Sequence, residues 1–442
     1  MEILLISVFS LGYFFIAFEH NFKIDKAATA LITGVLTWTI LVSFSDYKII
    51  DKELAHHLVD IGEIVFFLLG AMTIVELVDS HQGFRIITDK IKTTNAVKLL
   101  WILSTITFFF SAVLDNLTTA IVMAALLQKI IKSREQLLFF AGIMILAANA
   151  GGAWSPIGDI TTIMLWVGGQ ISLNIIPAII IPSAVCIIVP LIYVSFKYRG
   201  QNIEKPENVK EEKTKDVIPY ERNIIFTLGV LGLLFVPVFK TITHLPPYMG
   251  MLLSLGFLWV VTEIIHKGKD NIHKHSLTVP GALSKIEAST VFFFLGILLA
   301  VGSLQSGGIL NSLATILDDL IGNIYLINIF IGFLSAILDN VPLVAGAMGM
   351  YEITSSGDYA MDGVFWEFLA YCAGTGGSLL VIGSAAGVAV MGILRINFIW
   401  YIRKISFLAL IGYLAGAATS VSYTHLRAHE TEADLVCRLL LE

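Results

Sequence analysis

The sequence predicts an all-α polytopic membrane protein made of two inverted repeats, which contain re-entrant helical hairpins and broken helices. Three observations support this fold class: the composition, recurring apolar runs and an internal repeat. Of the 442 residues, 56% are hydrophobic and only 14% are charged. A soluble domain exposes far more charged surface than this, so we expect most of the chain to face the lipid bilayer.

The apolar runs have the length that a membrane-spanning helix needs. A helix rises 1.5 Å per residue, so about 20 apolar residues cross the hydrocarbon core. With further ambiguous stretches, the pattern predicts about ten to twelve membrane segments. The first run begins almost at Met1, without a basic n-region or a small-residue cleavage site, so we expect a retained span rather than a signal peptide. The clear runs are Leu4–Phe18, Ala27–Phe44, Ile61–Val78, Ile175–Phe196, Ile224–Val238, Met249–Ile265, Thr290–Leu304 and Phe398–Ala418.

Lysine and arginine residues concentrate in two segments, 197–222 and 267–285. The positive-inside rule places both segments in the cytoplasm. The first is rich in Lys, Glu and Pro and has no apolar period, so we expect a flexible linker there. The three cysteines, Cys186, Cys372 and Cys437, indicate neither a disulfide framework nor a metal cluster.

Three motifs recur in the same order at an offset of about 225 residues, which indicates a duplication. The predicted organisation is a first transmembrane half at 1–196, a cytoplasmic linker at 197–222 and a second transmembrane half at 223–420. If the first half crosses the membrane an odd number of times, the second half enters inverted, as is typical of secondary transporters. The motif pairs are FFLLG (66–70) with FFLG (293–296), SAVLDN (111–116) with SAILDN (335–340), and the glycine-rich segments 149–158 and 374–383.

Polar residues interrupt the apolar sequence at two places in each copy. The segment 99–128 is longer than one membrane-spanning helix, and its centre reads DNLTT at 115–119, which is costly in lipid. A re-entrant hairpin places that polar tip inside the protein, where Asp and Asn can cap the broken helix. In the second copy, Pro342 suits the first turn of a new helix. The glycine-rich stretches 149–159 and 374–384 predict helices that break at membrane depth and leave carbonyl groups available.

The charges at these places indicate the class of ligand. Asp115 and Asp339 lie at the hairpin tips and Asp159 in the first broken helix, whereas no Lys or Arg occurs in 99–128 or 324–365. Carboxylates beside amide, hydroxyl and backbone oxygens suit a small hard cation. A carboxylate in a low dielectric is also readily protonated. A group that takes either a cation or a proton provides the minimum chemistry of cation/proton exchange.

A simpler interpretation remains open for several of these residues. In this interpretation each Asp simply caps the end of a helix and binds no ion. This applies most to Asp159, because its counterpart in the second copy is Ser384. In the same interpretation, the neighbouring hydroxyl groups simply form hydrogen bonds with local backbone groups. Glu76 and His81 lie near a membrane–water boundary, where a solvated or structural role is the leading interpretation and a proton or pH response is the alternative.

The motifs LDNLTTA (114–120) and NAGGAWSPIGDITT (149–162) resemble those of NhaD-type sodium/proton antiporters of the ion transporter superfamily. The resemblance covers residues 1–418 and implies exchange of Na⁺, with Li⁺ as a second candidate cation, for H⁺. It also implies an elevator-like movement of the hairpin-bearing domain and a multi-pass location in the bacterial cytoplasmic (inner) membrane. It implies no cofactor and no nucleic-acid partner, and a homodimer is compatible with it.

The polar motif residues of that family correspond to residues in both copies of this chain. Na⁺ is expected at Asp115, Asp339 and neighbouring oxygens. The membrane acid and histidine of the family correspond to Glu76 and His81. The remaining ion-binding or transport residues that the resemblance implies are Asn116, Thr118, Thr119, Asn149, Asp159, Asn340, Ser378 and Ser384.

Other functions fit the motifs less well. An anion carrier of the same superfamily, for dicarboxylates or arsenite, predicts Ser-Asn-Thr tips, and Asp at both tips argues against it. An intramembrane aspartyl protease uses Tyr-Asp and Gly-x-Gly-Asp motifs, whereas Leu precedes Asp115 and Pro-Ile-Gly precedes Asp159. A passive channel does not need paired carboxylates, and no nucleotide-binding motif indicates a primary pump. We therefore expect a transporter rather than an enzyme.

The end of the chain differs in composition from the rest. After Thr419 the sequence reads SVSYTHLRAHETEADLVCRLLLE, which is charged and has no membrane period. It resembles translated adapter sequence. We therefore interpret residues 421–442 as a non-native tail that replaces the end of a last apolar span.

Overall fold

The computed structural model describes residues 1–17, 19–88, 93–204, 218–268, 277–286 and 288–439. Within these residues every regular element is a helix, and β-pairing is limited to the isolated bridges Asn95–Asn202 and Thr354–Ala360. Nine described helices are long and apolar enough to cross a membrane, or up to ten if one bent pair, Ile309–Leu320 with Ile324–Ser335, counts as one span. The all-α polytopic fold class is confirmed, with nine or ten candidate spans among the described residues against the ten to twelve segments expected. All the clear apolar runs except the first lie in these helices.

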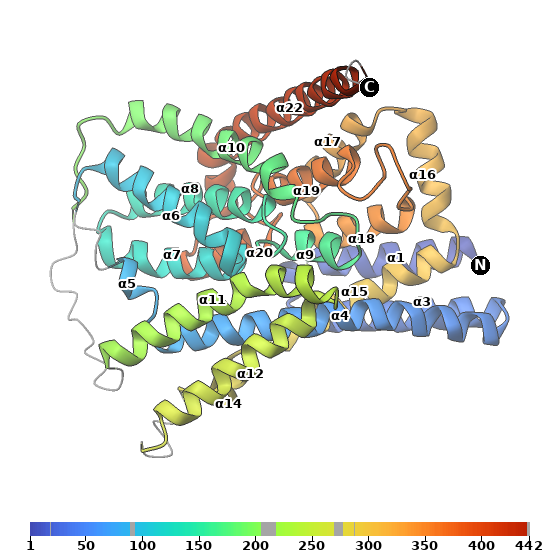
Figure 1. Ribbon diagram of the computed structural model, residues 1–442, viewed down its shortest axis with the longest axis horizontal. Coiled ribbons are helices and arrows are strands. Elements are labelled where there is room, and N and C mark those ends of the chain that lie inside the picture. The colour runs from blue at the N-terminus through green and yellow to red at the C-terminus, as the bar shows by residue number, and fades with distance from the viewer. Residues whose placement is uncertain (18, 89–92, 205–217, 269–276, 287, 440–442) are drawn as a thin grey trace. The chain divides into compact units, whose positions relative to one another are not determined.

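The chain folds into two compact units, and the first combines Met1–Thr94, Glu204–Ile316 and Ala345–Tyr351. The described part of the first expected apolar run, residues 4–17, lies in its first helix, which is shorter than a span, and Phe18 lies outside the described residues. The helices of unit 1, all but α2 labelled in Figure 1, are α1 (Glu2–Ala17), α2 (Glu19–Phe22), α3 (Lys26–Phe44), α4 (Tyr47–Ser80), α5 (Arg85–Thr88), α11 (Pro219–Thr243), α12 (Pro247–Ile265), α14 (Val279–Lys285), α15 (Ala288–Ser306) and most of α16 (Ile309–Leu320).

The core of unit 1 forms where α3 packs closely on α15. A Cβ atom on Gly34 would lie 2.6 Å from the carbonyl oxygen of Gly296, so the absence of side chains here allows the two backbones to approach each other. The indole N–H of Trp38 donates to the Leu299 carbonyl across the same contact, at 2.8 Å. Asp25 starts α3 by accepting a hydrogen bond from the Ala27 amide, at 2.8 Å.

Unit 2 combines Asn95–Ile203, Leu317–Val344 and Glu352–Glu442. The helix α18 (Asn340–Met350) begins in unit 2 and ends in unit 1. The other helices of unit 2 are α6 (Ala96–Leu114), α7 (Asn116–Ile130), α8 (Arg134–Ala153), α9 (Ile160–Val167), α10 (Ile175–Lys197), α17 (Ile324–Ser335), α19 (Val364–Gly376), α20 (Ala385–Leu394), α21 (Phe398–Tyr401), the π-helix η1 (Ile402–Ser406) and α22 (Phe407–Leu439).

The core of unit 2 lies around α8 and α19. α8 contacts α6, α7, α10, α19 and α20, and α19 contacts α9, α10, α17 and α22. In the 18-residue apolar stretch of α8, 89% of the stretch is buried inside the protein, against 22% of the corresponding stretch of α11. A membrane helix this enclosed can hold polar side chains, because its surface meets protein rather than lipid.

The structure confirms the helix breaks that the sequence predicts. α6 ends at Leu114 and α7 begins at Asn116, while α8 and α9 are separated by residues 154–159. The second copy has the same order of elements, with α17 and α18 followed by α19 and α20. The inverted orientation of the two copies, and the re-entrant path of the hairpins, stay predictions.

Two further sequence predictions concern segments that the structure describes only in part. The expected linker runs from 197 to 222, and its residues 205–217 lie outside the described residues. The backbone of the expected non-native tail continues α22 as far as Leu439, and its origin stays a prediction. The units also differ from the predicted halves, since each unit takes segments from both halves of the chain.

Candidate functional site

The first broken helix opens around two glycines in unit 2. A Cβ atom on Gly152 would lie 2.4 Å from the carbonyl oxygen of Gly158, so only glycine fits where the turn folds back on the end of α8. The amide of Gly158 donates to the Ser155 carbonyl at 3.2 Å, and the Ser155 hydroxyl donates to the Ala112 carbonyl at 2.6 Å. The turn is thereby held against the end of α6, and the next helix starts at Ile160.

Asp159 starts that next helix and is 1% exposed. Its Oδ1 atom accepts hydrogen bonds from the Thr161 amide at 2.9 Å and the Thr161 hydroxyl at 2.8 Å. The Asp159 amide in turn donates to the Thr162 hydroxyl at 3.2 Å, which completes a capping box. The interpretation of Asp159 as a helix cap is therefore confirmed, and its carboxylate has additional partners.

Asparagine amides from both hairpin tips converge on the Asp159 carboxylate. Asn116, the first residue of α7, donates from Nδ2 to Asp159 Oδ2. Asn340, the first residue of α18, donates from Nδ2 to Asp159 Oδ1 at 3.4 Å. An ionised carboxylate only accepts hydrogen bonds, so it fixes the direction in which both amides point.

Asn149 connects this carboxylate to the second broken helix. Its Oδ1 atom accepts from Asn116 Nδ2 at 3.2 Å, and its Nδ2 atom donates to the hydroxyls of Ser378 and Ser384, each at 2.9 Å. Ser384 also starts α20 by accepting from the Gly387 amide at 3.2 Å. We call the resulting hydrogen-bonded set the central polar network: Asn116, Asn149, Asp159, Asn340, Ser378 and Ser384. All six side chains are buried.

Asp115 and Asp339 lie at the edge of this network rather than in it. Asp115 caps α7, since its oxygens accept from the Thr118 amide at 2.8 Å and the Thr118 hydroxyl at 2.9 Å. Its φ of 77° is rare for a residue with a side chain. Asp339 accepts from the Val341 amide at 3.3 Å. Both are half-buried, and both interact electrostatically with Asp159.

Thr118 and Thr119, the two hydroxyls predicted beside the first tip, differ in their surroundings. The Thr118 hydroxyl is used in binding Asp115. Thr119 is completely buried, and its hydroxyl has no hydrogen-bond partner among the described residues. Its oxygen therefore retains lone pairs that can bind a ligand.

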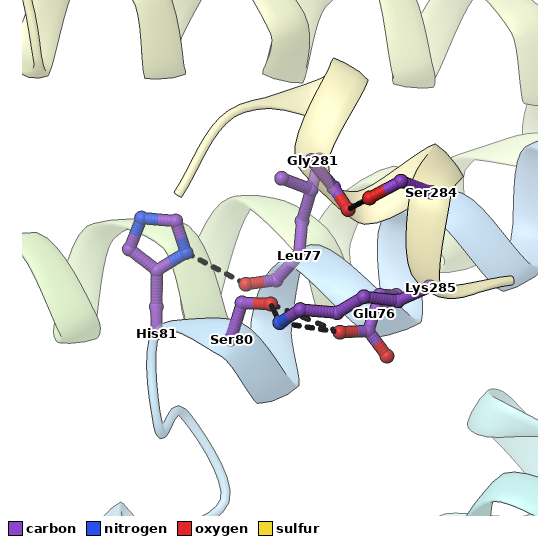
Figure 2. Close-up of polar contacts among 7 residues, drawn as sticks. All are labelled: Glu76, Leu77, Ser80, His81, Gly281, Ser284 and Lys285. Carbon is purple, nitrogen blue, oxygen red and sulfur yellow. Dashed lines mark hydrogen bonds and ion pairs between the residues drawn. The ribbon is translucent and has the colours of Figure 1, made fainter. Parts of the chain in front are cut away.

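Glu76 and His81 belong to unit 1, whereas the central polar network belongs to unit 2. Figure 2 shows Lys285 of α14 beside the end of α4, where its ammonium group lies 3.1 Å from Glu76 Oε1 and donates to the Ser80 hydroxyl at 2.7 Å. Ser80 donates to Glu76 at 3.0 Å. His81 is completely buried, and its Nδ1 atom is 2.7 Å from the Leu77 carbonyl.

Sequence reasoning missed several residues that the structure brings to the central polar network and to the end of α4. Thr161 has a local signal, because it stands two residues after a capping Asp. His266 has none, since its Nε2 atom lies 2.9 Å from His81 Nε2 although 185 positions separate the two residues. Tyr401 also has none, and its hydroxyl donates to the Ser378 carbonyl at 2.9 Å.

The central polar network is built around a single enclosed carboxylate. Among the described residues, no group of three or more His, Cys, Asp or Glu side chains could hold a metal ion. The network instead combines one enclosed carboxylate with amide and hydroxyl oxygens. Broken helices around a buried polar network in an all-α polytopic fold are typical of membrane transporters.

The family comparison agrees with this class. The family model for CitMHS, described as "Citrate transporter", matches residues 13–372. The chain therefore belongs to this family of transporters, and the prediction of a transporter rather than an enzyme is confirmed.

Curated relatives match nearly the whole chain. "Sodium/proton antiporter 1" of Arabidopsis thaliana is 47% identical over 426 residues, which is 95% of this chain and 72% of the relative. "Sodium/proton antiporter 2" of the same plant is 43% identical over 420 residues, or 93% and 97% of the two chains. The "Na(+)/H(+) antiporter NhaD" of Alkalimonas amylolytica is 28% identical over 445 residues, or 93% and 89%. The resemblance to NhaD-type antiporters is confirmed.

Proposed function

We propose that this protein exchanges Na⁺ for H⁺ across its membrane, with Li⁺ as a second candidate cation. The observation that supports this most directly is the enclosed Asp159 carboxylate, on which asparagine amides from both hairpin tips converge. The names of the plant and bacterial relatives support the same ions.

In this proposal, Na⁺ and H⁺ compete for the oxygens of Asp159. A bound Na⁺ displaces the Asn116 and Asn340 amide N–H groups, because both cation and amide need the same carboxylate lone pairs. Amide and hydroxyl oxygens of the network complete the cation's ligand shell, with Thr119 Oγ1 as a further donor of lone pairs. A proton on Asp159 removes its charge and releases the cation. Each proton bound on one side thus accompanies one cation released.

Asp115 and Asp339 remain in the proposal as ion-binding carboxylates. They adjoin Asn116 and Asn340 in sequence and interact electrostatically with Asp159. With no Lys or Arg in 99–128 or 324–365, the three carboxylates attract a cation toward the network. The backbone and hydroxyl of Thr118 keep Asp115 oriented.

The membrane and the oligomeric state stay predictions. The bacterial cytoplasmic membrane is supported by the bacterial NhaD relatives, whereas the relatives of 43–47% identity are plant proteins. Fractionation of the source cells with an antibody to this chain tests the membrane, and cross-linking in intact membranes tests the homodimer. Signal in another membrane, or a monomer only, would contradict the respective prediction.

An anion carrier is the second candidate function, because the matching family model is described as a citrate transporter. The polar surroundings argue against it. A citrate or dicarboxylate site needs positive groups or free N–H donors, but in the network the Asn116 and Asn340 amides donate to a carboxylate and the Asn149 amide donates to two serine hydroxyls. Uptake of radiolabelled citrate, succinate and arsenite by vesicles distinguishes the two functions.

The test of sodium/proton exchange is proton flux in everted vesicles, followed with a pH-sensitive dye after addition of NaCl, LiCl or KCl. We expect NaCl to dissipate the proton gradient with the wild type and with Asp319→Asn, a control at an exposed carboxylate. Asp159→Asn, Asp115→Asn and Asp339→Asn should abolish the response while leaving folded protein in the membrane. Wild-type exchange by Asp159→Asn would sink the proposed role of that carboxylate, and citrate uptake without a sodium response would favour the anion carrier.

We further propose that the end of α4 gives transport a pH response. His81 Nδ1 must carry a hydrogen to donate to Leu77, so one hydrogen between His81 Nε2 and His266 Nε2 completes their contact. The contact persists when both imidazoles are neutral and when one of them is protonated. When both are protonated, two positive charges lie 2.9 Å apart, and their repulsion separates the rings. His266→Gln should change the pH profile of exchange, and the exposed control His56→Gln should not. An unchanged profile in His266→Gln would contradict the proposal.

A further inference from the structure

Tyr401 connects the central polar network to the segment formed by α21 and η1. It ends α21, is completely buried, and donates from its hydroxyl to the Ser378 carbonyl at 2.9 Å. Ser378 lies in the turn between α19 and α20, and its own hydroxyl accepts from Asn149. Ser378 is therefore held from two sides, through its backbone by Tyr401 and through its side chain by Asn149.

The segment around Tyr401 is itself held on α8. Asn397 starts α21 by accepting from the Trp400 amide at 3.2 Å. The π-helix η1 follows directly, and its Ile405 packs so tightly on α8 that a Cβ atom on Gly142 would lie 2.6 Å from Ile405 Cδ1. π-Helical turns are rare and often occur at functional sites. α8 also holds Asn149, so the same helix supports both residues that bind Ser378.

We propose that Tyr401 is a positioning residue for the cation site, because its hydroxyl fixes the turn that presents Ser378 to Asn149. A broken helix leaves carbonyl groups without helical partners, and at membrane depth water cannot replace them. The Tyr401 hydroxyl satisfies one of these carbonyls. Without it, the turn relaxes, Ser378 moves away from Asn149, and the hydrogen bonds that orient Asn116 toward Asp159 loosen. The effect on cation binding rests on the proposed sodium/proton exchange, whereas the effect on the turn does not.

Unit 2 contains a matched control for this hydrogen bond. Tyr413 is also buried and donates from its hydroxyl to a backbone carbonyl, that of Ile329, at 3.2 Å. Ile329 lies within α17, remote in sequence from the turn at 377–384. The change Tyr→Phe removes one hydroxyl and keeps the ring in both places, so packing is conserved. A purely structural effect of losing a buried hydroxyl should therefore be similar in the two variants.

The experiment compares Tyr401→Phe, Tyr413→Phe and wild type in two measurements. In everted vesicles, Tyr401→Phe should raise the apparent KM for Na⁺ about three- to tenfold, the effect of one net hydrogen bond, with the maximal rate unchanged. Tyr413→Phe should keep the wild-type KM. In purified protein, hydrogen–deuterium exchange should become faster in peptides covering 377–387 in Tyr401→Phe only.

The two measurements separate this inference from the proposed function. A wild-type KM and wild-type deuterium exchange in Tyr401→Phe would overturn the positioning role, even if sodium exchange is established. An equal rise in KM in both variants would overturn it as well, because the effect would not be specific to the turn. If the wild type shows no sodium response, the proposed function fails, and the exchange rate of 377–387 still decides whether Tyr401 holds the turn.

Discussion

The two broken-helix copies in unit 2 share a backbone arrangement but contain different side chains. In the first copy the Ser111 hydroxyl donates to the Ala148 carbonyl at 2.5 Å. In the second copy the Ser335 hydroxyl donates to the Ala373 carbonyl at 2.8 Å. The residues that start the helices after the breaks also agree, with φ and ψ of −145° and 149° at Asp159 and −143° and 151° at Ser384.

Their chemistry differs at the matching positions that contribute to the network. Asp159 gives the first copy a buried carboxylate where Ser384 gives the second copy a hydroxyl. Asn149 extends an amide from the first copy to the second, whereas its counterpart Gly374 has no side chain and lies against Ala153. The duplication thus supplies two equivalent helix breaks. Differences between their side chains let the first copy provide the charge and the second copy provide neutral oxygens.

The largest expected effect tests the shared backbone arrangement. A Cβ atom on Gly151 would lie 2.2 Å from the Phe108 carbonyl oxygen, and one on Gly376 would lie 2.2 Å from the Gly332 carbonyl oxygen. Each clash is with backbone, so Gly151→Ala and Gly376→Ala should each destabilise unit 2 by about 3 kcal/mol. Thermal unfolding of detergent-solubilised protein measures this.

The matched control is Gly392→Ala in α20, where an added Cβ meets nothing within 4 Å. This substitution should leave stability unchanged or raise it by up to about 1 kcal/mol, because Gly is disfavoured inside a helix. If only one of the two buried glycines tolerates alanine, the copies are not equivalent in packing. If both tolerate it as well as Gly392 does, the close contact of the paired helices is refuted.

Much of the fold follows from local sequence. Apolar length predicts most of the spans, and the Gly, Pro and Asp residues predict the helix breaks of the two copies within a few positions, because both depend on short-range steric and hydrogen-bonding rules. The number of spans is harder to predict, since the first apolar run forms only a short helix, Glu2–Ala17. The contact units are also not evident from the chain order, because each takes segments from both predicted halves.

The candidate site was only partly predictable, for a physical reason. Repetition draws attention to Asp115 and Asp339, but the hydrogen bonds of the structure centre on Asp159, which has no acidic counterpart. A cap and a ligand look alike in sequence, and only the approach of side chains from remote segments separates them. Asn149 and Ser384 are 235 positions apart, and no local pattern predicts that they meet.

An exchange of side chains between the copies tests whether the position of the charge matters. Asp159→Ser should abolish sodium/proton exchange, because the network then has no carboxylate. The double variant Asp159→Ser with Ser384→Asp restores one carboxylate in the equivalent backbone position of the second copy. We expect no recovery, since Asn340 and Asn116 point toward position 159. Uptake of radioactive sodium driven by a pH gradient measures both variants, and recovery to wild-type uptake would show that either copy can hold the charge.

The smallest expected effect separates the two serines of the second copy. Ser384 starts α20 and accepts from Asn149, whereas the Ser378 hydroxyl has only the Asn149 contact among the described hydrogen bonds. Ser384→Ala should therefore cost about 1 kcal/mol of stability as a lost N-cap and should also weaken Na⁺ binding. Ser378→Ala should weaken Na⁺ binding by a similar amount, with less than about 0.5 kcal/mol of lost stability. Thermal unfolding and the apparent KM for Na⁺ measure the two effects separately. Equal losses of stability would mean that Ser384 does not act as a cap, and an unchanged KM in both variants would remove the neutral oxygens of the second copy from the site.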